Sequence, residues 1–202
     1  MTTDSARPST VARRKSVTSV KIVVAGAFGV GKTTFVGAVS DIHPVRTEAI
    51  MTAASNSYDS LDRVPLKSTT TVAMDFGRVE LEDDLLLYLF GTPGQERFWF
   101  MWDNLVRGAL GAVILADTRR LSDTFTSIDF FENRGIPYVV AINLFDGILH
   151  HRVESVRKAL SIDESVPVLT CDARERGPVK QTLLRLLEHV MAQVQAEDAK
   201  TS

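Results

Sequence analysis

The chain has 202 residues, and 45% of them are hydrophobic, which is enough for one domain with a sizeable core rather than two domains. Its formal net charge of −2 argues against nucleic acid as a general electrostatic partner. The single cysteine, Cys171, rules out an intrachain disulfide, and no hydrophobic run is long enough to span a bilayer. These features predict a cytoplasmic protein with at most peripheral membrane contact.

Polar segments flank the predicted domain. Residues 1–18 combine basic side chains with small and polar residues, which is typical of a mobile basic tail. Such a tail is either a solvated end or a weak docking segment for an acidic partner or a membrane face. The domain is expected to cover residues 19–196, followed by a short C-terminal tail at residues 197–202.

The first predicted strand, Val20 to Ala25, leads into residues 26–33, whose sequence GAFGVGKT fits the pattern G-x-x-x-x-G-K-[ST]. A helix is expected from Lys32 to Ser40, so the pattern has the strand, loop and helix context that it requires. The glycines let backbone N–H groups face a polyphosphate, and the start of the helix adds partial positive charge. The chain is therefore predicted to bind a nucleoside triphosphate.

The motif assigns roles to the residues of this loop. Lys32 is expected to reach the outer phosphates, and the Thr33 hydroxyl is expected to ligate Mg²⁺. The other loop residues that we expect to contact the nucleotide are Gly26, Phe28, Gly29, Val30, Gly31 and Thr34.

Beyond this loop, residues 41–68 form a polar, irregular stretch, whose length suggests a functional or partly helical loop. A hairpin follows, and then strands and helices alternate. The expected strands are Val72–Leu81, Leu85–Phe90, Ala112–Ala116, Tyr138–Ile142 and Val166–Thr170, and the expected helices are Thr124–Asn133, Arg152–Leu160 and Val179–Gln195. This order predicts an α/β fold: a six-stranded, mostly parallel sheet with one antiparallel strand and helices on both faces.

Further segments lie where a Ras-like small GTPase carries its nucleotide motifs. Residues 89–98, LFGTPGQERF, resemble switch II, and Thr71 best matches the threonine that closes switch I on Mg²⁺. Residues 143–146, NLFD, resemble the guanine-reading motif, and residues 171–174, CDAR, resemble the loop after the last strand. The chain after its tail is thus similar to a P-loop NTPase G domain of the Ras-like superfamily.

The form of switch II at residues 90–95, FGTPGQ, is similar to a bacterial branch of the superfamily related to gliding-motility GTPases. Actinobacterial conservon-type ATP/GTP-binding proteins are the members that resemble the chain most. The resemblance implies a GTP/GDP switch, with GTP as substrate, GDP as product and Mg²⁺ as cofactor. It also implies roadblock/LC7-type and sensor-kinase-like protein partners in a bacterial signalling system.

The resemblance implies roles in hydrolysis for Gln95, Lys32 and Thr71. Gln95 would orient the water that attacks the γ-phosphate, and the Gly94 backbone amide would bond to that phosphate. Phe28 fills the loop position nearest to the γ-phosphate, which predicts slow intrinsic hydrolysis. A partner would add an arginine or remodel the site, because no arginine has the motif context of a catalytic one; the candidates are Arg63, Arg78, Arg97, Arg119 and Arg120.

The resemblance also implies how the base is read. Asp146 would accept two hydrogen bonds from guanine, a donor pair that adenine lacks. Leu144 replaces the lysine whose stem covers the base, and it can pack on a purine but cannot make the lysine's hydrogen bond. The Ala173 amide would face guanine O6. The other residues expected to bind the nucleotide here are Asn143, Cys171 and Asp172.

Gly91 departs from the family pattern at the metal. It replaces the aspartate that holds Mg²⁺ through water, so Mg²⁺ is expected to be weakly held, by Thr33, Thr71, phosphates and waters. Asp75, four residues after Thr71, is either a substitute carboxylate or a polar strand residue.

These departures leave alternatives open. A nucleotide-binding pseudo-GTPase scaffold without useful turnover is favoured by Gly91, Phe28 and Leu144. An ATP-using phosphotransferase or ATPase is suggested by the phosphate loop alone, and Asp146 argues against it.

The aromatic run after switch II cannot face one core with all its side chains. Phe98 and Trp102, spaced i and i+4, are expected to point inward. Trp99 and Phe100 are the expected partner-binding residues.

Overall fold

Seven strands form one mixed sheet within the part of the chain that the computed structural model describes, residues 17–43, 45–52, 69–82 and 84–201. The strands are β1 (Thr18–Ala25), β2 (Val45–Thr52), β3 (Thr69–Glu82), β4 (Leu85–Gly91), β5 (Ala109–Ala116), β6 (Tyr138–Asn143) and β7 (Val168–Cys171). Their order across the sheet is β2-β3-β4-β1-β5-β6-β7. The phosphate loop that follows β1 therefore begins in the middle of the sheet.

Within the described sheet, β3 is the one antiparallel strand. It runs antiparallel to both of its neighbours, β2 and β4, whereas the remaining pairs are parallel. The predicted α/β fold with one antiparallel strand is confirmed. The seventh strand, β2, corrects the irregular stretch that we expected at residues 41–68. Its pairing with β3 supplies a ladder of hydrogen bonds that the local sequence does not signal.

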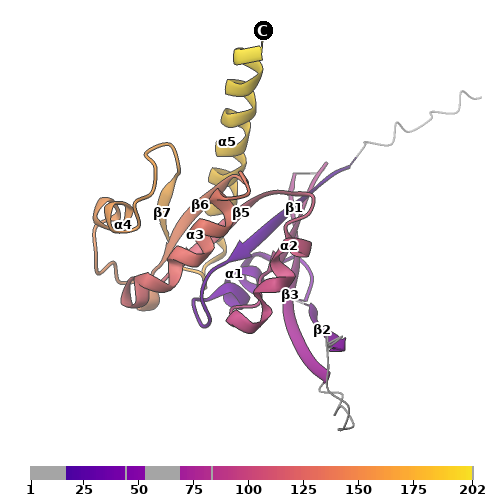
Figure 1. Ribbon diagram of the computed structural model, residues 1–202. Helices are drawn as coiled ribbons and strands as arrows, with labels where there is room; N and C mark the ends of the chain where they lie inside the picture. The colour runs from indigo at the N-terminus through magenta and orange to yellow at the C-terminus, as the bar shows by residue number, and fades with distance from the viewer. Residues whose placement is uncertain (1–16, 44, 53–68, 83, 202) are drawn as a thin grey trace, which may run out of the picture.

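Helices cover both faces of the sheet, as predicted. They are α1 (Lys32–Val39), α2 (Trp102–Leu105), α3 (Phe125–Glu132), α4 (Val153–Ala159) and α5 (Arg176–Thr201), with short 3₁₀ segments η1 (Glu96–Met101), η2 (Thr118–Thr124) and η3 (Phe145–Gly147). Core residues of α1 and α5 pack on one face, and those of α2, α3 and α4 pack on the other. The three layers leave the loops at the carboxyl ends of the parallel strands uncovered (Figure 1).

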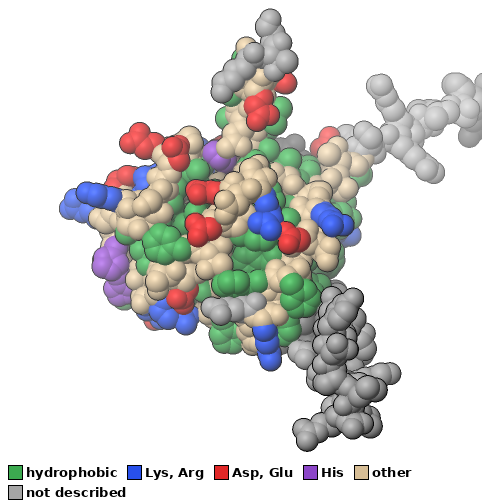
Figure 2. All heavy atoms as spheres, viewed as in Figure 1, with side chains coloured by type: hydrophobic (Ala, Val, Ile, Leu, Met, Phe, Trp, Pro, Cys, Tyr) green, Lys and Arg blue, Asp and Glu red, His purple; other side chains and the backbone are tan. Residues whose placement is uncertain are grey.

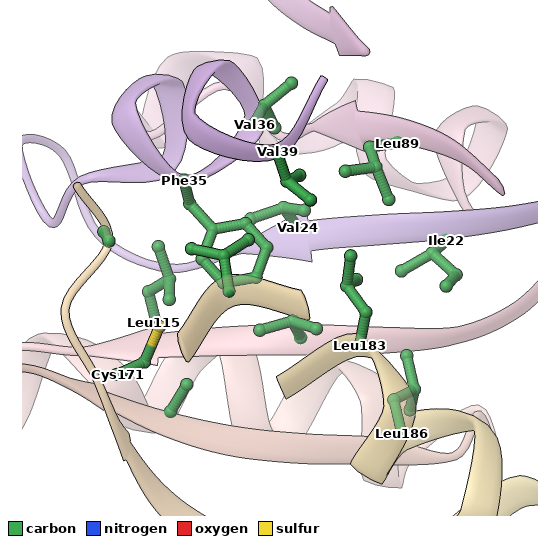
Figure 3. Packing of buried hydrophobic residues seen from close by; sticks show 14 of the residues in the cluster. Ile22, Val24, Phe35, Val36, Val39, Leu89, Leu115, Cys171, Leu183 and Leu186 are labelled. Carbon is green, nitrogen blue, oxygen red and sulfur yellow. The ribbon is translucent and has the colours of Figure 1, made fainter. Parts of the chain in front are cut away.

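Strand β1 is buried on both faces, which holds its carboxyl end in place. Ile22 and Val24 pack beneath α1 and α5, and Val23 and Ala25 point to the opposite face, as alternation along a strand requires. Figure 3 shows Phe35 of α1 close to Val24 in the first of these two clusters. Burying a side chain of this size contributes roughly 1.5 to 3 kcal/mol, so the strand and helix on either side of the phosphate loop are firmly anchored.

Helix α5 is longer than the sequence analysis predicts. Val179 is buried, whereas Val194, near the predicted end of the helix, is 51% exposed. The far part of α5 stands clear of the sheet (Figure 1). The expected tail at residues 197–202 is corrected, because the helix continues to Thr201. Its last residues favour helix and include neither glycine nor proline to end it.

The predicted basic tail lies almost entirely outside the described residues, and β1 already begins at Thr18. In the part of the chain that the structure describes, no helix is both long enough and hydrophobic enough to cross a membrane.

Candidate functional site

The loop between β1 and α1 turns through glycines with positive φ. A Cβ on Gly26 would lie 2.6 Å from the Leu115 carbonyl oxygen, and one on Gly31 would lie 2.7 Å from Asn143 Nδ2. Their φ angles of 134° and 107° are also disfavoured for residues with a side chain. The loop is therefore held tightly against β5 and the end of β6. Helix α1 starts directly after it, so the unpaired N–H groups of its first turn face the loop.

Lys32 is fixed inside the loop. Its Nζ donates to the carbonyl oxygens of Gly26 and Ala27 at 2.8 and 2.7 Å. The side chain is buried, and this burial lowers its pKa to about 8, although the Asp75 carboxylate acts in the opposite direction. Two neutral carbonyls do not neutralise the ammonium charge, so an anionic ligand is favoured beside it.

A cavity of about 420 Å³ collects most of the predicted phosphate and metal residues. Its lining residues are Phe28, Gly29, Gly31, Lys32, Thr33, Thr34, Asp75, Thr92, Pro93 and Gly94. We call it the phosphate cavity. Two loop residues expected here lie elsewhere: Gly26 lines a neighbouring cavity, and the Val30 side chain is buried in the core.

Asp75 reaches this cavity from β3. The Thr33 hydroxyl donates to Asp75 Oδ2 at 2.7 Å. Phe76 pairs with Phe90, so Asp75 and Gly91 are the next residues along two antiparallel strands. A Cβ on Gly91 would lie 3.0 Å from Asp75 Cβ and 3.1 Å from its Oδ2. The Asp75 side chain thus fills the space beside Gly91.

The oxygen atoms of the phosphate cavity fit Mg²⁺. Carboxylate and hydroxyl groups, here from Asp75 and Thr33, are the donors that this hard cation prefers. Thr92 Oγ1 is buried without a hydrogen-bond partner among the described residues, so a ligand or its water would satisfy it. Thr71, the other expected metal ligand, has its backbone in β3 opposite Ile50, and its side chain lies outside the described part.

Asn143, the last residue of β6, connects the phosphate loop to the predicted base-reading loop. Its Nδ2 donates to the Val30 carbonyl at 2.9 Å, and its Oδ1 accepts from the Ala173 N–H at 3.1 Å. The side chain is buried, which shields both hydrogen bonds from water. Asn143 therefore sets the spacing of the two loops.

A smaller cavity of about 170 Å³ lies on the other side of the loop. Its lining residues are Gly29, Gly31, Thr34, Asn143, Leu144, Phe145, Asp146, Asp172, Ala173 and Arg174. We call it the base cavity. It brings Asn143, Asp146, Asp172 and Ala173 together, as the resemblance implies. Leu144 forms part of its wall.

Two expected base contacts need correction. Cys171 is buried at the end of β7, does not line the base cavity, and has a pKa raised by burial to about 11. Its carbonyl instead accepts from the Leu144 N–H at 2.9 Å. The Ala173 amide, expected to face guanine O6, donates to Asn143. Both groups hold the loops to each other.

Asp146 lies at the rim of the base cavity. Its backbone is left-handed, with φ 59°, and its side chain is 86% exposed. Arg174 Nη1 is 3.8 Å from the Asp146 carboxylate, but the same guanidinium donates to Asp172 at 2.9 and 2.7 Å. The hydrogen bonds from Arg174 lower the pKa of Asp172. Asp146 is thus accessible to a ligand and only loosely paired.

An arginine held by an aspartate supports the base loop from outside the base cavity, and no sequence motif predicted this contact. Arg119, named only as a candidate catalytic arginine, lies 3.8 Å above the Phe145 ring. Its Nε and Nη2 donate to Asp117 at 2.9 and 2.8 Å, which lowers the pKa of that carboxyl. Asp117 follows directly on the buried strand β5, and this position at the carboxyl edge of the sheet is the signal that could have found it.

Gln95 does not face the phosphate cavity. Its Oε1 accepts from Arg97 Nε at 2.8 Å. Gln95 lines a neighbouring cavity of about 400 Å³ between the phosphate loop, η1 and α3, together with Trp99 and Arg120. In this conformation the predicted catalytic glutamine must turn before it can approach a phosphate.

Phe28 lies in the middle of the phosphate loop, and its backbone contacts Arg120 and Gly94. Its carbonyl accepts from Arg120 Nη2 at 2.9 Å. Gly94 packs against it from the other side, since a Cβ there would lie 2.8 Å from Phe28 Cα and 2.9 Å from Lys32 Nζ. The Phe28 ring remains 65% exposed. Arg120 is thus the candidate arginine that contacts the phosphate loop in the described structure.

The aromatic run divides largely as predicted. Phe98 and Trp102 are buried, and Trp102 Nε1 donates to the Pro93 carbonyl at 3.2 Å. Phe100 is 59% exposed and accessible to a partner, whereas Trp99 is half-buried because it packs against Trp102. Figure 2 shows hydrophobic side chains at the surface near α2.

Another cavity, of about 850 Å³, lies between β7 and α5. None of the predicted site residues lines it, so the candidate site is at the two smaller cavities.

Known proteins resemble the chain over most of its length. A family model described as conserved hypothetical ATP binding protein matches residues 24–193. An uncharacterised protein of Methanocaldococcus jannaschii is 32% identical over 129 residues, which cover 63% of this chain and 71% of that protein. The Ras-related protein Rab-18-B of Danio rerio is 24% identical over 183 residues, which cover 87% of this chain and 80% of that protein.

Solved structures share the fold. The cytosolic domain of the T. maritima FeoB iron transporter matches in a GDP form with a TM-score of 0.61 and 16% identity, and in an apo form with 0.60 and 14%. The match covers 86% of this chain and 64% of the FeoB chain in both structures. The G-domain fold class is therefore confirmed.

Proposed function

Because the chain belongs to the family described as conserved hypothetical ATP binding proteins and has the fold of a P-loop NTPase, we propose that it is a GTP/GDP-binding switch with slow intrinsic GTP hydrolysis. Nucleotide binding follows from family and fold. The guanine preference, the slow turnover and the signalling role are the parts that the proposal adds.

The observation that carries the proposal is the adjacency of the two cavities. The phosphate cavity and the base cavity share Gly29, Gly31 and Thr34. One side offers the Lys32 ammonium and hydroxyl oxygens, and the other offers the Asp146 carboxylate and the side chain of Leu144. A nucleotide lying across the phosphate loop would put its phosphates on the first side and its base on the second.

Asp146 supports guanine over adenine. Its exposed carboxylate at the rim of the base cavity can accept from the guanine N1–H and 2-amino group, whereas adenine would leave it unpaired. The family description names ATP, but the Ras-related relative supports the GTPase interpretation.

Hydrolysis would use the chain's own residues as follows. Lys32, already fixed by two carbonyls, would hold the outer phosphates and stabilise the negative charge that develops on them. Gln95 would turn away from Arg97 and orient the attacking water. Mg²⁺, when bound, would neutralise charge on the β- and γ-phosphate oxygens. The turn of Gln95 and the exposed Phe28 ring both support slow turnover.

A bacterial roadblock/LC7-type partner and sensor-kinase-like proteins complete the proposal. They come from the resemblance of switch II, and the exposed Phe100 beside that segment is an anchor for such a partner. The partner would shift Gln95 or add an arginine near Phe28.

Calorimetric titration with GTP, GDP and ATP, with and without Mg²⁺, tests the proposal, followed by phosphate release in the same samples. We expect guanine-selective binding and slow release. Asp146→Asn should move the preference from guanine towards xanthine nucleotides, and Asp129→Asn, on the exposed surface of α3, is the control. ATP binding as tight as GTP binding would overturn the guanine assignment.

A nucleotide-binding scaffold without turnover is the second candidate. The observation that favours it is the hydrogen bond of Gln95 to Arg97, in a cavity separate from the phosphates. Guanine-selective binding with no phosphate release over long incubations, alone or with a partner, would establish this candidate in place of the switch.

A further inference from the structure

Gly91 stands where the family pattern has an acidic residue, yet a carboxylate occupies the space beside it. Asp75 lies on the neighbouring strand, β3, in the register position next to the Phe76–Phe90 pair. A Cβ on Gly91 would come within 3.0 Å of Asp75 Cβ, which is closer than ordinary contacts between strands. A side chain at both positions would force one of them to shift by a few tenths of an ångström, so glycine at position 91 leaves room for the Asp75 side chain.

We propose that Asp75 is the carboxylate that holds the divalent cation of this site. It would do so from β3, in place of the acidic residue that the family pattern has on β4. This inference rests on the proposed function, because the cation would bind together with a nucleotide. It gives Gly91 the role of leaving room for the Asp75 side chain. It also replaces the expectation of weak Mg²⁺ binding with the expectation that Mg²⁺ and nucleotide strongly increase each other's affinity.

The surroundings of Asp75 match this role. Its Oδ2 accepts from the Thr33 hydroxyl at 2.7 Å, and Thr33 is the loop residue whose oxygen ligates Mg²⁺ in P-loop proteins. A hydroxyl that donates its proton to a carboxylate keeps its lone pairs for a cation. Asp75 and Lys32 line the same cavity, so the carboxylate lies close to the lysine that would hold the phosphates.

Thr92 gives a second, independent indication of a ligand. Its Oγ1 is buried and lacks a hydrogen-bond partner among the described residues, and the residue lines the phosphate cavity together with Asp75. A buried hydroxyl without a partner is unfavourable, so a ligand that pairs with it is favoured. A water bound to the cation would satisfy it and would be shared with the Asp75 carboxylate. The cavity thus offers carboxylate and hydroxyl oxygens around one position, as Mg²⁺ prefers.

The test compares GDP binding in excess MgCl₂ with GDP binding in EDTA, by calorimetry on the full chain. The ratio of the two dissociation constants measures how strongly Mg²⁺ and nucleotide are coupled. Asp75→Asn keeps the shape but removes the charge, and should reduce the ratio about 10- to 100-fold, the usual cost of losing a partner of this kind. The control Asp84→Asn, in the turn just before β4 and at the far end of that strand from Gly91, should leave the ratio unchanged.

An exchange variant makes the test specific. Asp75→Gly combined with Gly91→Asp returns the carboxylate to β4 and makes room for it on β3, so it should restore the ratio to near the original value. Gly91→Asp alone, which keeps Asp75, should lower the ratio, because the new side chain crowds the Asp75 carboxylate. Paramagnetic resonance of Mn²⁺ added with GDP provides a readout that does not depend on hydrolysis.

The outcomes separate this inference from the proposed function. Binding of GDP with the same Mg²⁺ ratio in the original chain and in Asp75→Asn would overturn the role of Asp75 and leave nucleotide binding intact. A lack of any GTP or GDP binding would overturn both. Circular dichroism establishes that each variant is folded, and if the exchange variant does not fold, the Asp75→Asn ratio decides.

Discussion

The phosphate end and the base end of the site differ in what their charged groups already contact. Lys32, at the phosphate end, contacts neutral carbonyls, and Thr92 Oγ1 has no partner among the described residues. At the base end, the guanidinium groups of Arg119 and Arg174 each make bidentate hydrogen bonds with an aspartate. Their partners are Asp117 and Asp172. The phosphate end therefore depends on a ligand to complete its interactions, whereas at the base end most charged groups are already paired and Asp146 is paired only loosely.

This difference indicates where affinity and selectivity arise. Unpaired groups in a water-poor cavity contribute strongly when a ligand reaches them. At the base end, most charges would have to be freed before they could contact a base, so selectivity depends chiefly on the loosely paired Asp146. Tight binding to phosphates with moderate discrimination between bases is the expected result.

The largest effect on nucleotide affinity should come from Lys32→Met, which removes the ammonium group from the phosphate end. Loss of two or more charge-assisted hydrogen bonds to the phosphates should weaken GDP binding about 10³-fold. Because burial lowers the pKa of Lys32 from 10.5 to about 8, the same change should stabilise the nucleotide-free fold by up to about 3 kcal/mol. Calorimetry and urea unfolding measure the two effects. Unchanged GDP affinity would remove Lys32 from the phosphate site.

Asn143→Ala should have the next largest effect on nucleotide affinity, because it removes the hydrogen bonds that join the two ends of the site. The change leaves the Val30 carbonyl and the Ala173 N–H buried without their partner, at a cost of roughly 2 to 3 kcal/mol in stability. Binding of GTP and ATP should fall by similar factors, about 10- to 100-fold, since both ends lose their spacing. A selective loss of GTP binding would mean that Asn143 contacts the base directly.

The phosphate loop could be predicted from sequence because its determinants are contiguous. One run of residues supplies the strand, the glycines, Lys32 and the start of the helix. The parallel strands were also predictable, since strands buried on both faces are continuous hydrophobic runs. The order of the motifs along the chain then placed Asp146 and Gln95 at strand ends.

The remaining features depend on contacts between distant residues. Strand β2 forms by pairing with β3, and Asp75 meets Gly91 only because the register of β3 and β4 places them opposite each other. The side-chain contact between Asn143 and the Ala173 amide joins residues that are 30 positions apart. Sequence patterns describe one segment at a time, so they could name these residues as candidates but could not specify their contacts.

Nucleotide affinity should depend on pH through Lys32, which lies at the phosphate end of the site. In the free protein the Lys32 pKa is about 8, and bound phosphates would raise it. Above about pH 8, the complex then holds more protons than the free protein, so affinity should fall up to about tenfold per pH unit. Below pH 8 both forms are protonated, and affinity should be flat. Calorimetry in buffers of different ionisation enthalpy, below the pH at which guanine N1–H ionises, counts the proton taken up.

The stability of the nucleotide-free protein should change in the opposite direction. The depressed pKa of Lys32 means that the unfolded chain binds more protons between about pH 8 and about pH 10.5. Unfolding free energy should therefore rise over this interval as the desolvation penalty is relieved. Lys32→Met should abolish both this rise and the loss of affinity. Persistence of the rise in that variant would assign it to another group.

The smallest expected effects on nucleotide affinity come from replacing Arg119 or Arg120, two neighbouring residues that contact different ends of the site. Arg120 donates to the Phe28 carbonyl, beside the loop position nearest to the γ-phosphate, whereas Arg119 stacks on Phe145 of the base loop. Arg120→Ala removes one exposed hydrogen bond and should weaken GTP binding about 3- to 10-fold, with a smaller effect on GDP. Arg119→Ala should weaken both nucleotides equally, because they share the base. Competitive titrations of GTP and GDP give the ratio directly, and equal ratios in the two variants would show that the ends of the site are not independent.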